Sequence, residues 1–238
     1  MNTRRRKKTN LEVLIRPKSS TSEQFREIYT NIKLSLKSDE EELRTIGITS
    51  SGSGEGKSTI ISNLAVIFAI MGERVLLIDG DLRKPKIAEK FGVSNNNDGL
   101  STLLTSKKKF NEVVIKISDV VNLSILTSGP IPPDPVRLLS SRKFDQILME
   151  FIEQYDVVLF DLPPLGILAD SNILASKLDG MLLVIRDHVT KKASLLRAKE
   201  LLERSDANVI GWVYNDGYGY GYGYGYKKES RLKKLFGF

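Results

Sequence analysis

The stretch TIGITSSGSGEGKST spans residues 45–59 and connects a predicted strand to a predicted helix. Residues 45–49 are a short, mainly apolar run, typical of a strand covered on both faces, and residues 57–71 have apolar side chains at helical spacing. The glycines between them let backbone N–H groups surround phosphate oxygens, and the helix N-terminus adds its positive dipole end. This order of strand, loop and helix is the one that a phosphate-binding P-loop requires.

Within this loop, Lys57 is expected to reach the β and γ phosphates of ATP, and Ser58 to offer its hydroxyl to Mg²⁺. The loop departs from the general G-x-x-x-x-G-K-[ST] pattern at its first position, where Ser51 replaces glycine. The predicted ATP-binding residues of the loop are Ser53, Gly54, Glu55, Gly56, Lys57, Ser58 and Thr59.

Three aspartates follow apolar runs. Asp79 and Asp81 end the run that begins at Val75, and Asp161 follows residues 157–160 in the Walker B arrangement. A lone D-x-D pair is more often a pair of solvated acids, but this one follows a P-loop helix. Because ligands of an open parallel sheet bind at the carboxyl ends of its strands, we expect the three acids near the phosphates. The predicted metal-site residues are Ser58, Asp79, Asp81 and Asp161, which are enough to neutralise the triphosphate and to leave one of the three carboxylates free to act as a base.

The remaining elements alternate in the same way. Further strands are predicted at residues 74–79, 123–127, 156–161, 181–185 and 209–214, and further helices at 141–154 and 191–205. Near-continuous apolar strands that alternate with helices indicate a parallel sheet covered on both faces. The predicted fold class is therefore α/β, a three-layer, doubly wound, mainly parallel sheet of the P-loop NTPase type.

The basic residues are concentrated at the two ends of the chain. The formal charge is +7, of which residues 4–8 contribute +5 and residues 227–234 contribute +4, so the rest of the chain carries −2. A nucleic-acid groove needs basic residues on the domain itself, so no nucleic-acid partner is expected. Basic ends are attracted to anionic lipid, although they can also be solvated ends that aid solubility.

Other classes of protein are disfavoured by composition. The chain has no cysteine, which excludes disulfides and thiol nucleophiles, and its single histidine, His188, cannot form a multi-histidine metal site. The longest apolar run, residues 64–71, falls short of the roughly 20 residues of a spanning helix, and no secretory signal is recognisable at the N-terminus. We expect a cytoplasmic protein.

Two further segments suggest how the chain is organised. Residues 22–36 have an apolar face and predict an amphipathic helix, with Ser22 as its cap, that packs on its own domain or on a second copy. Residues 217–226 alternate glycine and tyrosine, which predicts a flexible tail, or alternatively a β-prone tract. We therefore expect a basic arm at residues 1–20, a P-loop domain at 21–216, and a Gly/Tyr tail with a basic end at 217–238.

Four segments together resemble the bacterial tyrosine kinases of capsule and exopolysaccharide synthesis, in their cytoplasmic single-domain form. They are residues 50–59, the sequence IDGDLRKP at 78–85, LTSGPIPP at 126–133, and FDLPP at 160–164. The resemblance extends from about Leu11 to the tyrosine segment. The second of these motifs, called Walker A′ in that family, is highly specific in combination with a C-terminal tyrosine cluster.

The resemblance implies an ATP- and Mg²⁺-dependent protein-tyrosine kinase that phosphorylates its own C-terminal tyrosines between the subunits of a ring. It implies activation by the cytoplasmic end of a separate transmembrane protein of the polysaccharide chain-length type, recruitment to the inner face of the membrane, and a cognate tyrosine phosphatase. The family motif E-x-x-R-x-x-R at the subunit interface is matched by Glu23 and Arg26, but Tyr29 replaces the last arginine. The implied phosphoacceptors are Tyr218, Tyr220, Tyr222, Tyr224 and Tyr226.

A tyrosine hydroxyl, with a pKa near 10, needs positioning and a base at neutral pH. We assign Asp79 as the acceptor of its proton and Asp81 to the metal, with the reverse assignment open; Lys57 completes the predicted catalytic set. Asn215 is predicted to contact the adenine, by similarity to related ATPases, or else to cap its strand. Arg83 and Asp170 lie close to the motifs in sequence, but no role can be assigned to them.

Two alternatives remain. A P-loop ATPase that positions division sites or segregates plasmids carries a signature lysine at the place that Gly52 occupies here, and has no use for a tyrosine tail. A nucleotide-dependent scaffold for polysaccharide enzymes would bind ATP without transferring phosphate.

Overall fold

The computed structural model describes residues 9–35, 43–95, 98–166 and 170–216, and it contains a seven-stranded sheet in the order β3-β4-β2-β5-β1-β6-β7. Neighbouring strands run parallel except for β3, which is antiparallel to β4. The strands are β1 (Thr45–Ser50), β2 (Val75–Asp79), β3 (Ile115–Lys116), β4 (Leu123–Leu126), β5 (Val157–Asp161), β6 (Gly180–Arg186) and β7 (Val209–Asn215).

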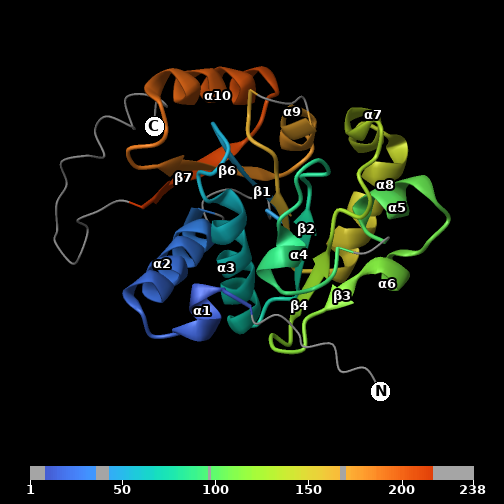
Figure 1. Ribbon diagram of the computed structural model, residues 1–238, viewed down its shortest axis with the longest axis horizontal. Helices are drawn as coiled ribbons and strands as arrows, with labels where there is room; N and C mark the ends of the chain where they lie inside the picture. Colours follow the sequence, from blue (N-terminus) through green and yellow to red (C-terminus); the bar gives the residue numbers. More distant parts are fainter. Residues whose placement is uncertain (1–8, 36–42, 96–97, 167–169, 217–238) are drawn as a thin grey trace.

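Helices cover both faces of the sheet, with α1, α2 and α3 together on one side (Figure 1). On the other face, α8 and α10 contribute to a second core. The helices are α1 (Glu12–Ile15), α2 (Ser20–Ser35), α3 (Lys57–Ile70), α4 (Ile87–Lys90), α5 (Leu100–Thr105), α6 (Phe110–Val113), α7 (Pro135–Leu139), α8 (Arg142–Gln154), α9 (Asp170–Ala175) and α10 (Lys192–Arg204).

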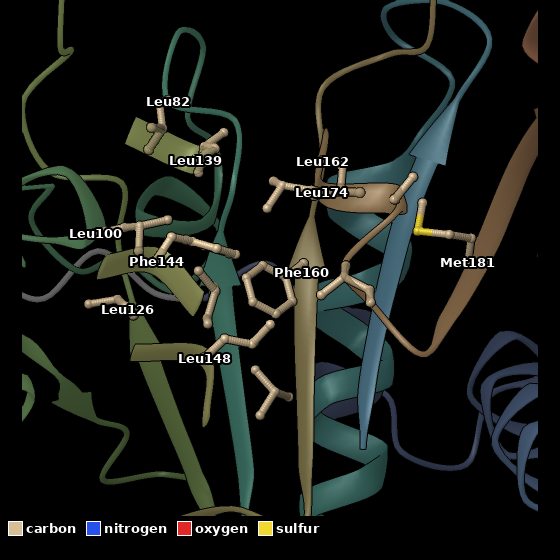
Figure 2. Packing of buried hydrophobic residues seen from close by; sticks show 14 of the residues in the cluster. Leu82, Leu100, Leu126, Leu139, Phe144, Leu148, Phe160, Leu162, Leu174 and Met181 are labelled. Atoms are coloured by element: carbon tan, nitrogen blue, oxygen red, sulfur yellow. The ribbon is translucent and has the colours of Figure 1, made fainter. Parts of the chain in front are cut away.

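The two cores take alternate residues from the same strands. In β5, Phe160 points to the cluster formed with α8, whereas Leu159 belongs to the cluster formed with α3. Figure 2 shows the Phe160 ring between Phe144, Leu148 and other side chains of its cluster. Residues of a strand that alternate between two apolar layers must all be apolar, which is why these strands read as continuous apolar runs.

The predicted fold class is confirmed, and all six predicted strands are present, with ends shifted by at most one residue. The sequence pattern missed β3 and the short helices α1, α4, α5, α6, α7 and α9. β3 has two residues, and α1, α4 and α6 have four each, so none of them is long enough to show a period in the sequence.

The expected boundary of the N-terminal arm needs a correction. Leu11 and Val13 are buried and belong to the core on the α3 side. The backbone N–H of Val13 also donates to Asn63 Oδ1 of α3, at 3.1 Å. The part of the expected arm from Leu11 onwards therefore packs as part of the domain, while residues 1–8 lie outside the described residues.

Helix α2 packs its apolar face on its own domain, which was one of the two possibilities left open by the amphipathic pattern; the other was packing on a second copy. Phe25 and Ile32 are buried in the α3-side core, and the ring of Tyr29 meets that of Phe68 edge to face at 4.8 Å. The predicted cap was wrong: Ser19 Oγ accepts the N–H of Ser22 at 3.2 Å, so the helix starts earlier than its apolar pattern suggested.

The sheet brings the functional segments to one edge. β1 lies between β5 and β6, and β2 lies next to β5, so the carboxyl ends of β1, β2 and β5 are neighbours. Asp79 and Asp161 are directly opposite each other in the register of β2 and β5. Within the described ranges, no helix is both long enough and apolar enough to cross a bilayer.

Candidate nucleotide and phosphoryl-transfer site

The loop between β1 and α3 depends on glycine at two positions. Gly54 has φ +78° and Gly56 has φ +99°, a region that side chains with a Cβ rarely adopt. A Cβ at Gly56 would also stand 2.2 Å from Asn215 Nδ2. Glycine at position 56 therefore lets the loop and the end of β7 approach each other closely.

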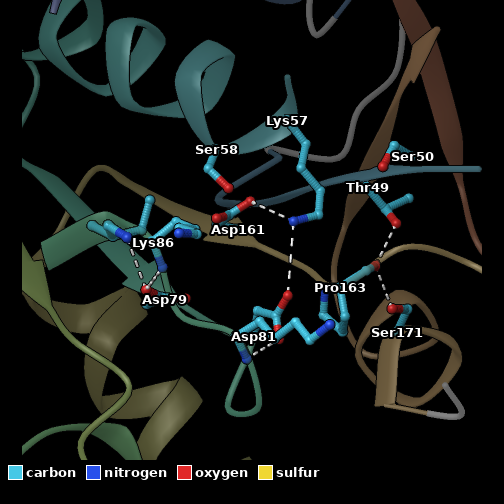
Figure 3. Close-up of polar contacts among 12 residues, drawn as sticks. Thr49, Ser50, Lys57, Ser58, Asp79, Asp81, Lys86, Asp161, Pro163 and Ser171 are labelled. Carbon is cyan, nitrogen blue, oxygen red and sulfur yellow. Dashed lines mark hydrogen bonds and ion pairs between the residues drawn. The ribbon is translucent and has the colours of Figure 1, made fainter. Parts of the chain in front are cut away.

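Lys57 connects the three predicted motifs. Its ammonium group lies 3.8 Å from Asp81 Oδ2 and 3.9 Å from Asp161 Oδ1, and its side chain is only 12% exposed. Figure 3 shows Lys57 reaching from the start of α3 to a place between the two carboxylates, with Ser58 beside Asp161. The cation and the acids that the sequence pattern predicted therefore share one site.

Asp161 is fully buried at the end of β5. Neither of its carboxylate oxygens has a hydrogen-bond partner among the described residues. Burial raises the pKa of Asp161 above its ordinary value, and the charge of Lys57 partly opposes that rise. A buried carboxylate without hydrogen bonds is costly unless a cation lies close to it, and here the Lys57 ammonium group lies 3.9 Å from Oδ1.

Asp79 is also buried, but one of its oxygens is bonded. Oδ2 accepts the backbone N–H groups of Lys86 and Ile87, each at 2.9 Å, whereas Oδ1 is buried and has no partner in the described chain. Burial, and next the negative charge of Asp161, raise the pKa of Asp79, and the two N–H bonds oppose the rise. A raised pKa suits a group that is to take a proton at neutral pH.

Asp81 has different surroundings. Its Oδ1 accepts the N–H of Lys84 at 2.9 Å and that of Arg83 at 3.3 Å, while Oδ2 faces Lys57. One oxygen of the Asp81 carboxylate is thus bonded to its own loop, and the other is directed toward Lys57 in the site.

The Asp161 oxygens, which accept no hydrogen bond, fit a divalent cation together with Asp81 and Ser58, because carboxylate and hydroxyl oxygens are the ligands that Mg²⁺ prefers. However, no group of three or more acidic or histidine side chains is close enough, within the described ranges, to enclose a metal by itself. The expected set of three acids and Ser58 around one metal is therefore not preformed. Mg²⁺ commonly keeps several waters and binds one or two carboxylates together with phosphates, which agrees with this arrangement.

Glu55 and Asn215 act within the loop. The Glu55 carboxylate is buried, accepts the N–H and hydroxyl of Ser51, and accepts the Thr190 hydroxyl at 2.6 Å. Asn215 Nδ2 donates to the carbonyl of Glu55 at 2.9 Å. Asn215 is therefore adjacent to the phosphate loop, and its contact with adenine stays a prediction.

Two residues at the end of β6 were missed by sequence reasoning. Arg186 donates to the carbonyl of Gly54, and Thr190 donates to Glu55. The signal available in the sequence was their place just after an apolar strand, at the edge where ligands bind.

Arg83 and Asp170, which had no assigned role, form an ion pair. Arg83 Nε lies 2.9 Å from Asp170 Oδ2, and the carboxylate is almost fully buried. The pair connects the loop after β2, which carries Asp81, to the start of α9. It therefore helps to hold that loop in place.

The predicted interface residues lie on the exposed side of α2. Arg26 Nη1 is 2.5 Å from Glu23 Oε1, and Arg26 Nη2 donates to the carbonyl of Pro17. Tyr29, which stands where the family pattern has arginine, donates its hydroxyl to Glu73 at 3.0 Å instead. The five predicted phosphoacceptor tyrosines lie outside the described residues.

Comparison with known proteins gives consistent matches over this site. A family model described as an AAA domain matches residues 43–190. Tyrosine-protein kinase YwqD of Bacillus subtilis is 42% identical over 210 residues, covering 88% of this chain and 87% of the relative. The putative tyrosine-protein kinase CapB of Staphylococcus aureus is 39% identical over 200 residues, covering 84% of this chain and 86% of the relative.

The fold has a matching solved structure, described as the chimerical protein CapA2B2. It superposes with a TM-score of 0.82 at 35% identity, covering 89% of this chain and 92% of that one. The matched region of both relatives and of this structure includes most of the chain, so it includes the phosphate loop and the three aspartates together. The resemblance seen in the sequence motifs is thereby confirmed, and the chain belongs to the family of bacterial tyrosine kinases.

Proposed function

We propose that the protein transfers the γ-phosphoryl group of ATP to tyrosine hydroxyls, including those of its own C-terminal segment, and thereby regulates capsular or exopolysaccharide synthesis. The observation that carries the proposal is the position of Lys57 between Asp81 and Asp161, with Asp79 buried beside them. This arrangement joins a phosphate-binding cation to a carboxyl group whose pKa suits proton transfer. Family membership favours it over a positioning or partitioning ATPase.

The residues would divide the work as follows. Lys57 stabilises negative charge on the transferring phosphoryl oxygens, which is where most catalysis of phosphoryl transfer arises. Asp79 accepts the proton of the tyrosine hydroxyl, while Asp81 and Asp161, with Ser58, would hold Mg²⁺. When bound, Mg²⁺ supplies charge neutralisation for the triphosphate. The exchange of roles between Asp79 and Asp81 is the alternative assignment.

The partners belong to the same proposal. We infer that unphosphorylated subunits form a ring in which each tyrosine segment reaches a neighbouring site, and that Glu23 and Arg26 contact that neighbour. The cytoplasmic end of a transmembrane protein would activate the kinase at the inner face of the membrane, and a phosphatase would reverse the reaction. The exposed position of Glu23 and Arg26 on α2, and the basic ends of the sequence, support these roles.

Intact-mass spectrometry tests the proposal. Purified protein is mixed with Mg-ATP and the cytoplasmic end of its activator, beside a variant in which the five tail tyrosines are changed to Phe. We expect up to five added phosphates on the wild type and none on the tail of the variant. A scaffold that binds ATP without transferring phosphate would leave both masses unchanged, and phosphate on serine would contradict the tyrosine assignment.

A further inference from the structure

Arg186, at the end of β6, contacts both the phosphate loop and the residue that immediately precedes the tyrosine segment. We propose that Arg186 is a positioning residue for the phosphate loop and that Asp216 holds it in place. Nucleotide affinity would then depend on Asp216, the residue that immediately precedes the tyrosine segment. The inference rests on the proposed ATP site and adds two residues to it.

The contacts of Arg186 use both sides of its guanidinium group. Nη1 donates to the carbonyl oxygen of Gly54 at 2.8 Å, while Nε and Nη2 both lie 2.7 Å from Asp216 Oδ2. The guanidinium group is planar and presents its donors in a fixed fork, so fixing one edge on Asp216 sets the direction of the other. Asp216 therefore orients the donor that reaches Gly54.

The bond to Gly54 determines where the next N–H group points. Because the peptide unit is planar and trans, the N–H of Glu55 is antiparallel to the carbonyl of Gly54. Asn215 Nδ2 holds the carbonyl of Glu55 in the same manner, at 2.9 Å, which orients the N–H of Gly56. Two successive carbonyls are thus tied to the ends of β6 and β7, and two successive N–H groups are directed away from them. Successive N–H groups of this kind form an anion-binding nest.

Further hydrogen bonds hold Arg186 and the ends of β6 and β7 in place. Thr190 Oγ1 accepts the backbone N–H of Arg186 at 2.9 Å and donates to Glu55 Oε1 at 2.6 Å. The N–H of Asp187 donates to the carbonyl of Asn215 at 2.9 Å, which ties the ends of β6 and β7 together. The Arg186 and Asp216 side chains are 38% and 49% exposed, and ion pairs this exposed add little to stability. Their contribution is therefore the orientation of the loop rather than the stability of the fold.

The test compares nucleotide affinities. Dissociation constants for Mg-ADP and for AMP are measured by calorimetry on the wild type and on Arg186→Ala, Arg186→Lys and Asp216→Asn. Asp156→Asn is the matched control, because it removes a partner of similar exposure from Arg74, which lies just before β2, at the opposite ends of the strands. We expect Arg186→Ala to weaken Mg-ADP binding about tenfold or more, as for a lost hydrogen bond to a charged donor, and Asp216→Asn to weaken it about threefold.

The pattern across ligands and variants separates positioning from a general structural effect. The N–H groups of the loop bind the α and β phosphates, and AMP has no β phosphate. Arg186→Ala should therefore weaken the binding of AMP much less than that of Mg-ADP. Arg186→Lys should recover part of the loss, Asp156→Asn should bind as the wild type does, and Asp216→Asn should have no further effect in an Arg186→Ala background. Equal losses for ADP and AMP, additive effects of the two changes, or wild-type affinity of Asp216→Asn would overturn the proposal. Failure of the wild type to bind Mg-ADP would instead contradict the proposed function.

Discussion

Lys57 shows how a single side chain unites the site. It comes from the start of α3 and reaches Asp81, just after β2, and Asp161, the last residue of β5, two strands that are far apart in sequence. Its charge opposes the pKa rise of Asp161, so the buried cation and the buried acids compensate for each other. Removal of Lys57 therefore affects both the phosphate site and the acids.

The first prediction concerns Lys57→Met. Loss of the ammonium group should abolish measurable tyrosine phosphorylation, because the charge that stabilises the transferring phosphoryl group is absent. Phosphotyrosine is measured by mass spectrometry with Mg-ATP and the activator. Lys199→Met is the matched control, since Lys199 lies on α10 and pairs with Glu203. Activity retained by Lys57→Met at the level of Lys199→Met would contradict the assignment.

The second prediction follows from the raised pKa values of Asp79 and Asp161. Because the pKa values of Asp79 and Asp161 are higher in the folded protein than the unfolded value of 3.8, their protonation stabilises the nucleotide-free fold. This stabilisation is fully present below pH 3.8 and is lost as the pH rises through the raised pKa values of the folded state. A bound cation favours the charged carboxylates, so Mg-ADP binding should release protons between about pH 6 and 8, the raised pKa values of Asp161 and Asp79.

Proton release is measured by calorimetry in two buffers that differ in ionisation enthalpy. The wild type should give different apparent enthalpies in the two buffers, and Asp79→Asn should reduce the difference. Thermal stabilisation by Mg-ADP should also be larger at pH 8 than at pH 6. Equal enthalpies in both buffers would mean that neither carboxyl is protonated in the nucleotide-free protein.

At the scale of elements, the phosphate loop depends on the contact between the β1–α3 connection and the end of β7. The loop has two glycines with positive φ, but an added Cβ would meet another element only at Gly56. Backbone strain and crowding can thus be separated by changing the two glycines one at a time.

The third prediction compares Gly56→Ala with Gly54→Ala. Both changes place a Cβ at positive φ, which costs about 1–2 kcal/mol. At Gly56 the Cβ would also meet Asn215 at 2.2 Å, whereas at Gly54 it would meet nothing within 4 Å. Mg-ADP affinity should fall much more for Gly56→Ala than for Gly54→Ala. Equal losses for the two glycine changes would exclude crowding by Asn215.

The fourth prediction concerns the attachment of α8 to the sheet. Phe160 is fully buried between β5 and α8, and Phe144 and Leu148 lie in the same cluster. Phe160→Ala should lower the free energy of unfolding by about 3–5 kcal/mol, because it leaves a cavity in a packed core. Urea denaturation gives the value, with Met149→Ala on the exposed side of α8 as the control. A loss of under about 1 kcal/mol would mean that the core closes around the gap.

At the scale of the whole molecule, the net positive charge is concentrated at the two ends of the sequence. Residues 4–8 and 227–234 together carry +9, and the rest of the chain carries −2, which gives the total of +7. The acids of this slightly acidic part include the three aspartates of the nucleotide site. The five predicted phosphoacceptors directly precede the C-terminal basic residues. Each phosphate adds about −1.5 to −2 charges, so full phosphorylation would reverse the sign of that end.

The fifth prediction is that phosphorylation weakens assembly or attraction to anionic lipid. Fully phosphorylated wild type should sediment as a smaller species, or bind vesicles containing phosphatidylserine less tightly, than the unphosphorylated protein does. The variant with all five tail tyrosines changed to Phe, treated with Mg-ATP, controls for effects of the nucleotide. Identical sedimentation and lipid binding before and after phosphorylation would contradict it.

The sequence by itself determined the fold class, the phosphate loop and the three aspartates. Continuous apolar runs are required in strands covered on both faces, and glycines next to a helix start are required around phosphate, so both are visible as local patterns. The order of the strands was not visible, because it depends on which apolar faces meet. The placement of Asp79 opposite Asp161 follows from that order.

Only the tertiary structure decided which polar groups support the site. Arg186 and Asp216 are separated by 29 intervening residues and Arg83 and Asp170 by 86, so no periodicity relates them. The same holds for Tyr29, whose pKa is raised to about 12 by burial and by its bond to Glu73, a partner that lies beyond α3. The sequence gives the identity of each side chain, but the packing of helices on the sheet determines which hydrogen-bond partner it meets. The position of Lys57 between two carboxylates depends on both.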